Sequence, residues 1–161
     1  MPHREDTPSD FILPTRPDLV WVAPGFALGS KPYAHQRNAI VALGIGTVVT
    51  LQEPEPSETE DWQVLGVTFV RVSTPDWVEI PAAVFDRAVE IVSTCLQSNE
   101  AVLLHCLAGL NRAPTVAAAV LCRLRALGVE AALAAVKRAR PAARPTPEQE
   151  KSLRLWFDMR F

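Results

Sequence analysis

The residues best suited to chemistry in this chain are a cysteine and an arginine separated by five residues. Cys106 follows a short apolar run, residues 100–105, and Arg112 precedes a helical run that begins at Pro114. The loop between them therefore connects the carboxyl end of a strand to the N-terminus of a helix, where open α/β sheets bind their ligands. The spacing predicts a nucleophilic cysteine within an anion-binding loop.

The loop has the parts needed to hold a tetrahedral oxyanion above the sulfur. A thiol attacks only as its thiolate, and a helix N-terminus favours that anion. The backbone N–H groups can curl inward around an anion, with Gly109 supplying the backbone freedom, and the planar fork of Arg112 can hold two phosphate oxygens. These features predict phosphoryl transfer to sulfur and then hydrolysis of a phosphocysteine. The predicted phosphate-binding residues are Leu107, Ala108, Gly109, Leu110, Asn111 and Arg112.

The stretch from His105 to Pro114, His-Cys-Leu-Ala-Gly-Leu-Asn-Arg-Ala-Pro, resembles the signature of the cysteine-dependent protein phosphatases. It is most similar to the dual-specificity branch, and its core is similar to that of the phosphatases of regenerating liver. Residues 24–30 also resemble the start of dual-specificity phosphatase domains. One position departs from the family pattern, because most relatives carry Ser or Thr after the arginine and this chain has Ala113. That hydroxyl supports the departing thiolate, so the departure concerns the breakdown of the phosphoenzyme.

A phosphatase also needs an acid that protonates the leaving oxygen. Asp76 stands 30 residues before Cys106, a separation typical of the family, in a segment that joins a predicted strand to the next helix. We predict that Asp76 is the general acid and then the general base for water, and the alternative is that it caps a turn after Pro75. Asp61 and Asp86 are weaker candidates because both fall inside predicted helices.

Two further residues have possible supporting roles. His105 is expected to hydrogen-bond to the loop backbone and to tune the thiolate. Thr146 and Gln149 have capping-box spacing at the start of the last helix. Relatives often carry a polar residue in this region that helps to place the hydrolytic water, so Gln149 fits either role. The basic loop 140–145 is predicted either to steer an anionic substrate or to be an ordinary cluster at a helix end.

Alternation of helix and strand predicts one α/β domain, with a mostly parallel central sheet of about five strands and helices on both faces. Residues 1–18 are predicted to form an N-terminal arm, and residues 19–161 the phosphatase domain. A helix is expected to start at residues 29–32 with Ser30 as its cap, and Gly128 is expected to end the helix that follows the loop. One face of that first helix is expected to hold Tyr33, Arg37, Ile40 and Val41.

Composition narrows the setting in which this chemistry would operate. The chain has 161 residues, of which 48% are hydrophobic, and a formal net charge of −2, so no basic face for nucleic acid is predicted. No segment reads as a membrane span or a signal peptide, and the C-terminus carries no prenylation box, unlike the regenerating-liver phosphatases. Three cysteines imply no disulfide framework, which favours the reducing cytoplasm. His3 and His35 form no metal pattern, and neither a metal nor another cofactor is predicted.

The predicted function is therefore that of a monomeric phosphatase acting on phosphotyrosine, and on phosphoserine or phosphothreonine, in proteins or peptides. A phosphoinositide phosphatase is an alternative, but such relatives tend to carry lysines where this loop has Leu107 and Leu110. An RNA 5′-triphosphatase is suggested by Asn111 but not by the overall charge. Ala113 leaves open a weakly active phospho-binding module, and a rhodanese-like reading would not require Asp76.

Overall fold

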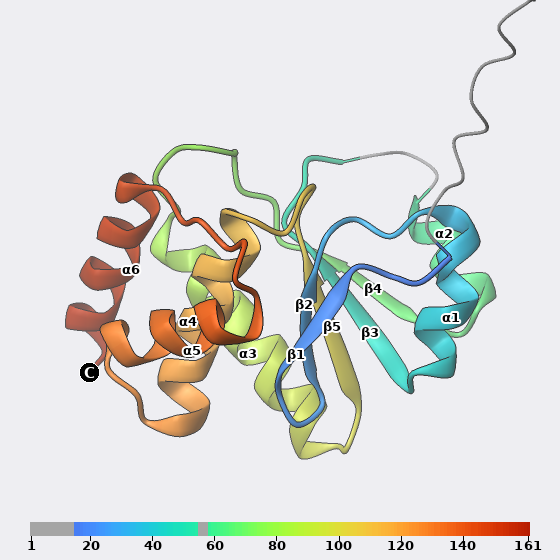
Figure 1. The fold of residues 1–161 in the computed structure, drawn as a ribbon. Helices are drawn as coiled ribbons and strands as arrows, with labels where there is room; N and C mark the ends of the chain where they lie inside the picture. The colour runs from blue at the N-terminus through green and yellow to red at the C-terminus, as the bar shows by residue number, and fades with distance from the viewer. Residues whose placement is uncertain (1–14, 55–57) are drawn as a thin grey trace, which may run out of the picture.

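A five-stranded sheet divides the helices of the computed structural model, which describes residues 15–54 and 58–161, into two layers (Figure 1). The strands lie in the order β1-β2-β5-β3-β4, and all neighbours are parallel except the β1–β2 hairpin. This agrees with the predicted mostly parallel sheet. The strands are β1 Leu19–Ala23, β2 Phe26–Gly29, β3 Ile45–Thr50, β4 Thr68–Arg71 and β5 Ala101–His105.

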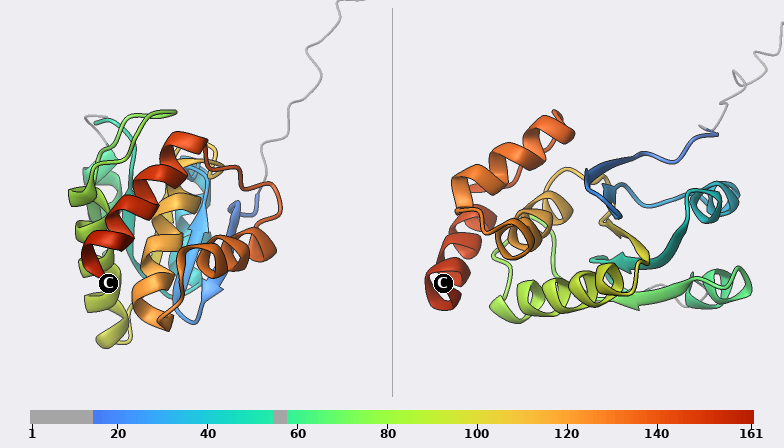
Figure 2. Two further views of the ribbon diagram at one scale, coloured as in Figure 1. Left: turned by 90° about the vertical axis from the view of Figure 1, so that its left-hand side faces the viewer. Right: turned by 90° about the horizontal axis from the view of Figure 1, so that it is seen from below.

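The helices cover both faces of the sheet, as predicted. The 3-10 helix η1, α1 and α2 lie on one side, and α3 to α6 lie on the other, as the view from below shows (Figure 2). Their bounds are η1 Ala34–Gln36, α1 Arg37–Ala42, α2 Glu58–Val64, α3 Ala82–Gln97, α4 Arg112–Arg125, α5 Val129–Ala139 and α6 Pro147–Arg160. No helix among the described residues is long and apolar enough to span a membrane.

Each face of the sheet has its own core, because side chains alternate along the buried strands. Leu104 of β5 packs on the side of α3 and α4, and Leu103 packs on the side of α1 and α2 around Trp62. A core therefore packs on each face of β5, and its two edges pair with the parallel strands β2 and β3. The carboxyl end of β5, where Cys106 follows, is therefore fixed from all sides.

The prediction of a helix starting at residues 29–32 is wrong. The N–H of Ser30 donates to the Asp18 carbonyl at 3.1 Å, and the N–H of Lys31 donates to the Leu107 carbonyl at 2.9 Å. These donors are committed to distant parts of the chain, so the first helical turn forms only at Ala34. Of the face expected for this helix, Ile40 is fully buried, whereas Tyr33 and Val41 are exposed.

The ends of α4 also differ from the prediction. The helix begins at Arg112 rather than at Pro114, so the arginine belongs to its first turn. It ends at Arg125, where Ala126 takes a left-handed conformation with φ of 52°, and Gly128 instead precedes α5 as its N-cap. The Ala-rich run over residues 129–139 also predicts a helix from the sequence, and α5 has these bounds.

The predicted boundary between arm and domain, after residue 18, lies next to residues that contact the domain. Residues 1–14 of the predicted arm lie outside the described residues. Residues 16–18 do contact the domain: the Arg16 carbonyl accepts from the side chain of Gln36 at 2.8 Å, and Asp18 holds Ser30 as described above. The segment just before β1 is thus part of the folded body.

Candidate active site

Cys106 lies at the floor of a pocket at the carboxyl end of the sheet. Its residue is 2% exposed and directly follows β5, and the loop after it ends where α4 starts at Arg112. The cavity has a volume of about 710 Å³. It is lined by Asp76, Trp77, Cys106, Leu107, Ala108, Leu110, Asn111, Arg112, Ala142 and Arg144. The residues predicted for catalysis, Cys106, Arg112 and Asp76, therefore meet in one pocket.

Every carbonyl of the loop from residue 106 to residue 110 accepts a hydrogen bond from outside the loop. The acceptors are matched with donors as follows: Cys106 with His105 Nδ1 at 3.0 Å, Leu107 with Lys31 N–H at 2.9 Å, Ala108 and Gly109 with the Arg140 guanidinium at 3.1 and 2.8 Å, and Leu110 with Arg144 N–H at 2.6 Å. The loop backbone is therefore anchored by its oxygens.

This anchoring fixes the direction of the loop amides. The peptides are trans, so each carbonyl points opposite to the N–H of the next residue. Within the part of the chain that the structure describes, the N–H groups of residues 107–111 donate to no other residue. A concave set of backbone N–H groups without protein partners is a site for an anion.

Gly109 is required at its position in the loop. Its φ is 68°, a left-handed conformation that favours glycine, and an added Cβ would lie 2.6 Å from the Gly29 backbone at the end of β2. The loop thus packs directly on the neighbouring strand end, which no side chain at this position would allow.

Arg112 extends the same donor set from the side. Its residue is 5% exposed, and Nη1 donates to the carbonyls of Thr74 at 3.1 Å and Leu51 at 3.4 Å. Nε is buried and has no hydrogen-bond partner among the described residues. One nitrogen therefore fixes the guanidinium to the ends of two loops, and its other donors remain for a ligand in the pocket.

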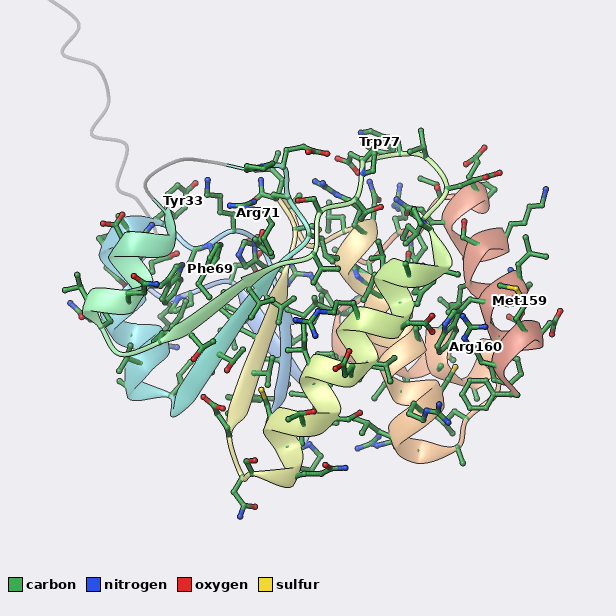
Figure 3. All side chains as sticks on the ribbon, turned by 180° about the vertical axis from the view of Figure 1, so that it is seen from behind. Tyr33, Phe69, Arg71, Trp77, Met159 and Arg160 are labelled. Carbon is green, nitrogen blue, oxygen red and sulfur yellow. The ribbon has the colours of Figure 1, made fainter. Side chains whose placement is uncertain are left out.

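Asp76 faces this arginine from the loop between β4 and α3. Its Oδ1 lies 3.5 Å from Arg112 Nε and accepts a hydrogen bond from the Trp77 N–H at 3.0 Å. Trp77 lies on this loop at the edge of the molecule (Figure 3). It is 65% exposed and has a φ of 65°, a strained conformation for an aromatic residue. Of the other two acids considered, Asp61 pairs with Arg37 and Asp86 with Arg160, and neither lines the pocket.

His105 makes the backbone contact that the sequence predicted. The ring is fully buried at the end of β5, and burial lowers its pKa from 6.5 to about 4. The imidazole is therefore neutral at pH 7, and because its Nδ1 faces a carbonyl, Nδ1 carries the hydrogen. His105 serves the loop as a hydrogen-bond donor.

Gln149 forms the predicted capping box with Thr146. The Thr146 N–H donates to Gln149 Oε1 at 3.0 Å, and the Gln149 N–H donates to Thr146 Oγ1 at 3.2 Å. Gln149 is fully buried and is not among the residues that line the pocket. The structure supports the capping role, and placement of a hydrolytic water by Gln149 stays a prediction.

The other two cysteines have different surroundings from Cys106. Burial raises the pKa of Cys122 to about 11 and also raises that of Cys95, whose thiol contacts the Thr47 hydroxyl. Both are therefore thiols at neutral pH, and neither lines the pocket. The described residues also contain no group of three or more His, Cys, Asp or Glu side chains placed to hold a metal ion.

Sequence reasoning missed the residues that hold the site from a distance. Thr74 offers its carbonyl to Arg112, and Arg140 binds two loop carbonyls, although its sequence context suggested substrate steering or a helix-end cluster. Only Arg144 of that basic loop, exposed at the pocket, fits a steering role. Only tertiary contact distinguishes these arginines, because their local sequence pattern is the same.

Known proteins are similar to this chain in both sequence and fold. The family model for the dual specificity phosphatase catalytic domain matches residues 27–159. Dual specificity phosphatase 28 of Homo sapiens is 30% identical over 135 residues, covering 83% of this chain and 74% of that protein. Dual specificity protein phosphatase 15 of Rattus norvegicus is 30% identical over 127 residues, which are 78% of this chain but only 52% of the rat protein. The crystal structure of Tk-PTP in its active form superposes with a TM-score of 0.83 at 27% identity, covering 90% and 99% of the two chains.

Proposed function

The chain belongs to the dual-specificity phosphatase family, and on that premise we propose that it hydrolyses phosphomonoesters on proteins through a phosphocysteine at Cys106. The observation that carries the proposal is the set of unpaired donors around the sulfur. Within the described chain, the amides of residues 107–111 and the Nε of Arg112 have no hydrogen-bond partner, and Nε makes only the 3.5 Å ion pair with Asp76. A bound phosphate dianion would satisfy these donors together.

The first chemical step is phosphoryl transfer to sulfur. The thiolate of Cys106 attacks phosphorus as the bond from phosphorus to the leaving oxygen breaks, and Asp76 gives its proton to that oxygen. Amides that already point at the equatorial oxygens stabilise the developing charge without reorganising. Arg112 adds a charge-assisted fork on the same oxygens.

The second step releases phosphate and restores the enzyme. Water attacks the phosphocysteine, Asp76 accepts one of its protons, and the sulfur–phosphorus bond breaks to regenerate the thiolate. Ala113 is fully buried at the second position of α4, so this chain supplies no hydroxyl there for the departing sulfur. Breakdown of the phosphoenzyme is accordingly the step that we expect to limit turnover.

The surface of the pocket favours a phosphorylated side chain over a highly charged headgroup. Leu107 and Trp77 are exposed at the pocket, and Leu110 and Ala142 add apolar surface. An aryl ring can pack on such a rim while its phosphate reaches the loop, which suits phosphotyrosine. We propose that the protein acts on phosphotyrosine, and on phosphoserine or phosphothreonine, as a monomer in the reducing cytoplasm, where Cys106 would stay a thiol or thiolate.

The proposal is tested with an aryl phosphate and two cysteine variants. We expect wild-type protein to hydrolyse p-nitrophenyl phosphate, and Cys106→Ser to lose at least about 10³-fold in kcat while still binding substrate, because an alcohol is a far weaker nucleophile than a thiolate. Cys122→Ser is the matched control and should retain wild-type kcat if it folds. Full activity in Cys106→Ser would contradict the mechanism.

A further inference from the structure

Arg140 is a buried cation that the proposed reaction does not use. It caps the C-terminal end of α5, its side chain is 8% exposed, and four of its five N–H groups are committed. Nε donates to the Gly109 carbonyl and Nη2 to the Ala108 carbonyl, while Nη1 and Nη2 bind the two carboxylate oxygens of Asp18 at 3.0 and 2.8 Å. One guanidinium thus joins the loop of residues 106–112, called the phosphate loop below, to the segment before β1.

The two carbonyls that Arg140 binds are the central ones of the loop. The carbonyl of Cys106 is held from the strand end, that of Leu107 from residue 31, and that of Leu110 from residue 144. Among the described residues, the carbonyls of Ala108 and Gly109 accept hydrogen bonds only from Arg140. Because each peptide is trans, binding these carbonyls outside the loop turns the N–H groups of Gly109 and Leu110 toward the pocket.

The carboxylate of Asp18 binds both Nη atoms of Arg140 and so fixes the orientation of the guanidinium plane toward the two loop carbonyls. Asp18 is itself fixed, because its backbone carbonyl accepts from the Ser30 N–H at 3.1 Å. Gly29 packs against this same carbonyl: an added Cβ at position 29 would lie 2.2 Å from it, so no side chain fits there. The hydrogen bonds from Arg140 also lower the pKa of Asp18, so the carboxylate is charged at neutral pH.

We propose that Asp18 and Arg140 are a positioning pair, which orients the amides of Gly109 and Leu110 toward the phosphate. The proposal rests on the proposed function in one respect, namely that this loop binds a tetrahedral oxyanion. It assigns a role in the site to Asp18, which precedes the stretch of residues 27–159 that matches the family model. Neither residue lines the pocket, so both act through the loop backbone.

The geometry of the pair requires arginine. The guanidinium is planar and presents donors on two edges, so it can bind two carbonyls and a carboxylate at once. A lysine would keep the charge but has a single nitrogen, which cannot reach all three groups in the same way. Charge alone and geometry are therefore separable by substitution.

The test is the affinity of the folded protein for sodium tungstate, a tetrahedral oxyanion, measured by isothermal titration calorimetry. We expect Arg140→Lys to weaken tungstate binding about tenfold, because two amides lose their fixed direction. Arg138→Ala is the matched control, since it removes a cation from the same helical turn at an exposed position; its dissociation constant should stay within about twofold of wild type. Unchanged binding in Arg140→Lys would overturn the proposal.

Asp18→Asn provides a second test at an exposed position, where the substitution spares the core. We expect it to weaken tungstate binding about threefold in the wild-type background and to have no further effect in Arg140→Ala, because the two residues act as one unit. Equal effects in both backgrounds would overturn the pair. Circular dichroism and thermal unfolding identify any variant that is merely less stable, since lost stability alone leaves the affinity of the folded protein unchanged.

Parallel assays with p-nitrophenyl phosphate separate this proposal from the proposed function. If wild-type protein binds tungstate but hydrolyses no ester, the enzymatic proposal fails and the tungstate series still decides the role of the pair. If hydrolysis occurs and the Arg140 and Asp18 variants bind tungstate like wild type, the positioning pair fails and the enzymatic proposal stands.

Discussion

The two loops that meet over the pocket are held in different ways. The phosphate loop, residues 106–112, has its carbonyls from 106 to 110 bound by donors from four other places in the chain. The acid loop, residues 73–81, is held at its ends, where Thr74 meets Leu51 and Arg112, and the Ile80 N–H donates to the Ser152 hydroxyl. Among the described residues, the segment from Pro75 to Glu79 makes one hydrogen bond, which the Trp77 N–H donates to Asp76 Oδ1.

This difference matches the work that each loop would do. Charge stabilisation benefits from donors that are already oriented, because they need not reorganise during the reaction. An acid that first protonates a leaving group and then activates water must serve two oxygens in turn. The acid loop allows this, because among the described residues it is hydrogen-bonded to the rest of the chain only at its ends, and outside the loop Asp76 makes only a 3.5 Å ion pair with Arg112. Changes to the phosphate loop should therefore affect anion binding and stability, and changes to the acid loop should affect proton transfer.

The sharpest test of this division is Asp76→Asn. We expect kcat toward a substrate with a poor leaving group to fall by about 10²–10⁴-fold, because the leaving oxygen receives no proton. Tungstate affinity should stay within about threefold of wild type, since the phosphate loop is unchanged. Asp61→Asn, an exposed carboxylate outside the pocket, is the matched control. A comparable loss of tungstate binding in Asp76→Asn would erase the distinction between the loops.

His105, the residue at the end of β5 that holds the first carbonyl of the phosphate loop, should show its own signature in the pH dependence of stability. The unfolded state protonates His105 near pH 6.5, whereas the folded state keeps it neutral down to about pH 4. Stability is therefore full above pH 6.5 and declines as the pH falls to about 4, by on the order of 3 kcal/mol from this group. The free energy of unfolding, measured with urea at several pH values in this range, should change less steeply with pH in His105→Gln than in wild type. An identical slope would contradict a buried neutral imidazole.

The smallest expected effect concerns Ala113, at the junction of the phosphate loop and α4. We expect Ala113→Ser to raise kcat by up to about tenfold, because a hydroxyl there can donate to the departing thiolate. Ala117→Ser, equally buried one turn further along α4, should give no such gain. An unchanged kcat in Ala113→Ser would show that breakdown of the phosphoenzyme does not limit turnover.

The same contrast explains which features could be predicted from the sequence. Local signals were sufficient for the strand, loop and helix around Cys106, the Thr146–Gln149 capping box and the bounds of α5, since each depends on neighbours in the chain. The course of residues 29–33 could not be predicted, because the N–H groups of Ser30 and Lys31 bind residues distant in sequence. The role of Arg140 depends in the same way on Asp18 and Gly109, so its sequence context carried no sign of it.

Transfer of phosphate to Cys106 can be observed directly by rapid-quench trapping of the phosphocysteine. Asp76→Asn, which lacks the base for the second step, is mixed with a ³²P-labelled aryl phosphate that has a good leaving group, and the labelled peptide is identified by mass spectrometry. We expect label approaching one phosphoryl group per chain on Cys106, and none in the Asp76→Asn protein that also carries Cys106→Ser. Label on another residue, or steady hydrolysis by a protein without Cys106, would contradict it.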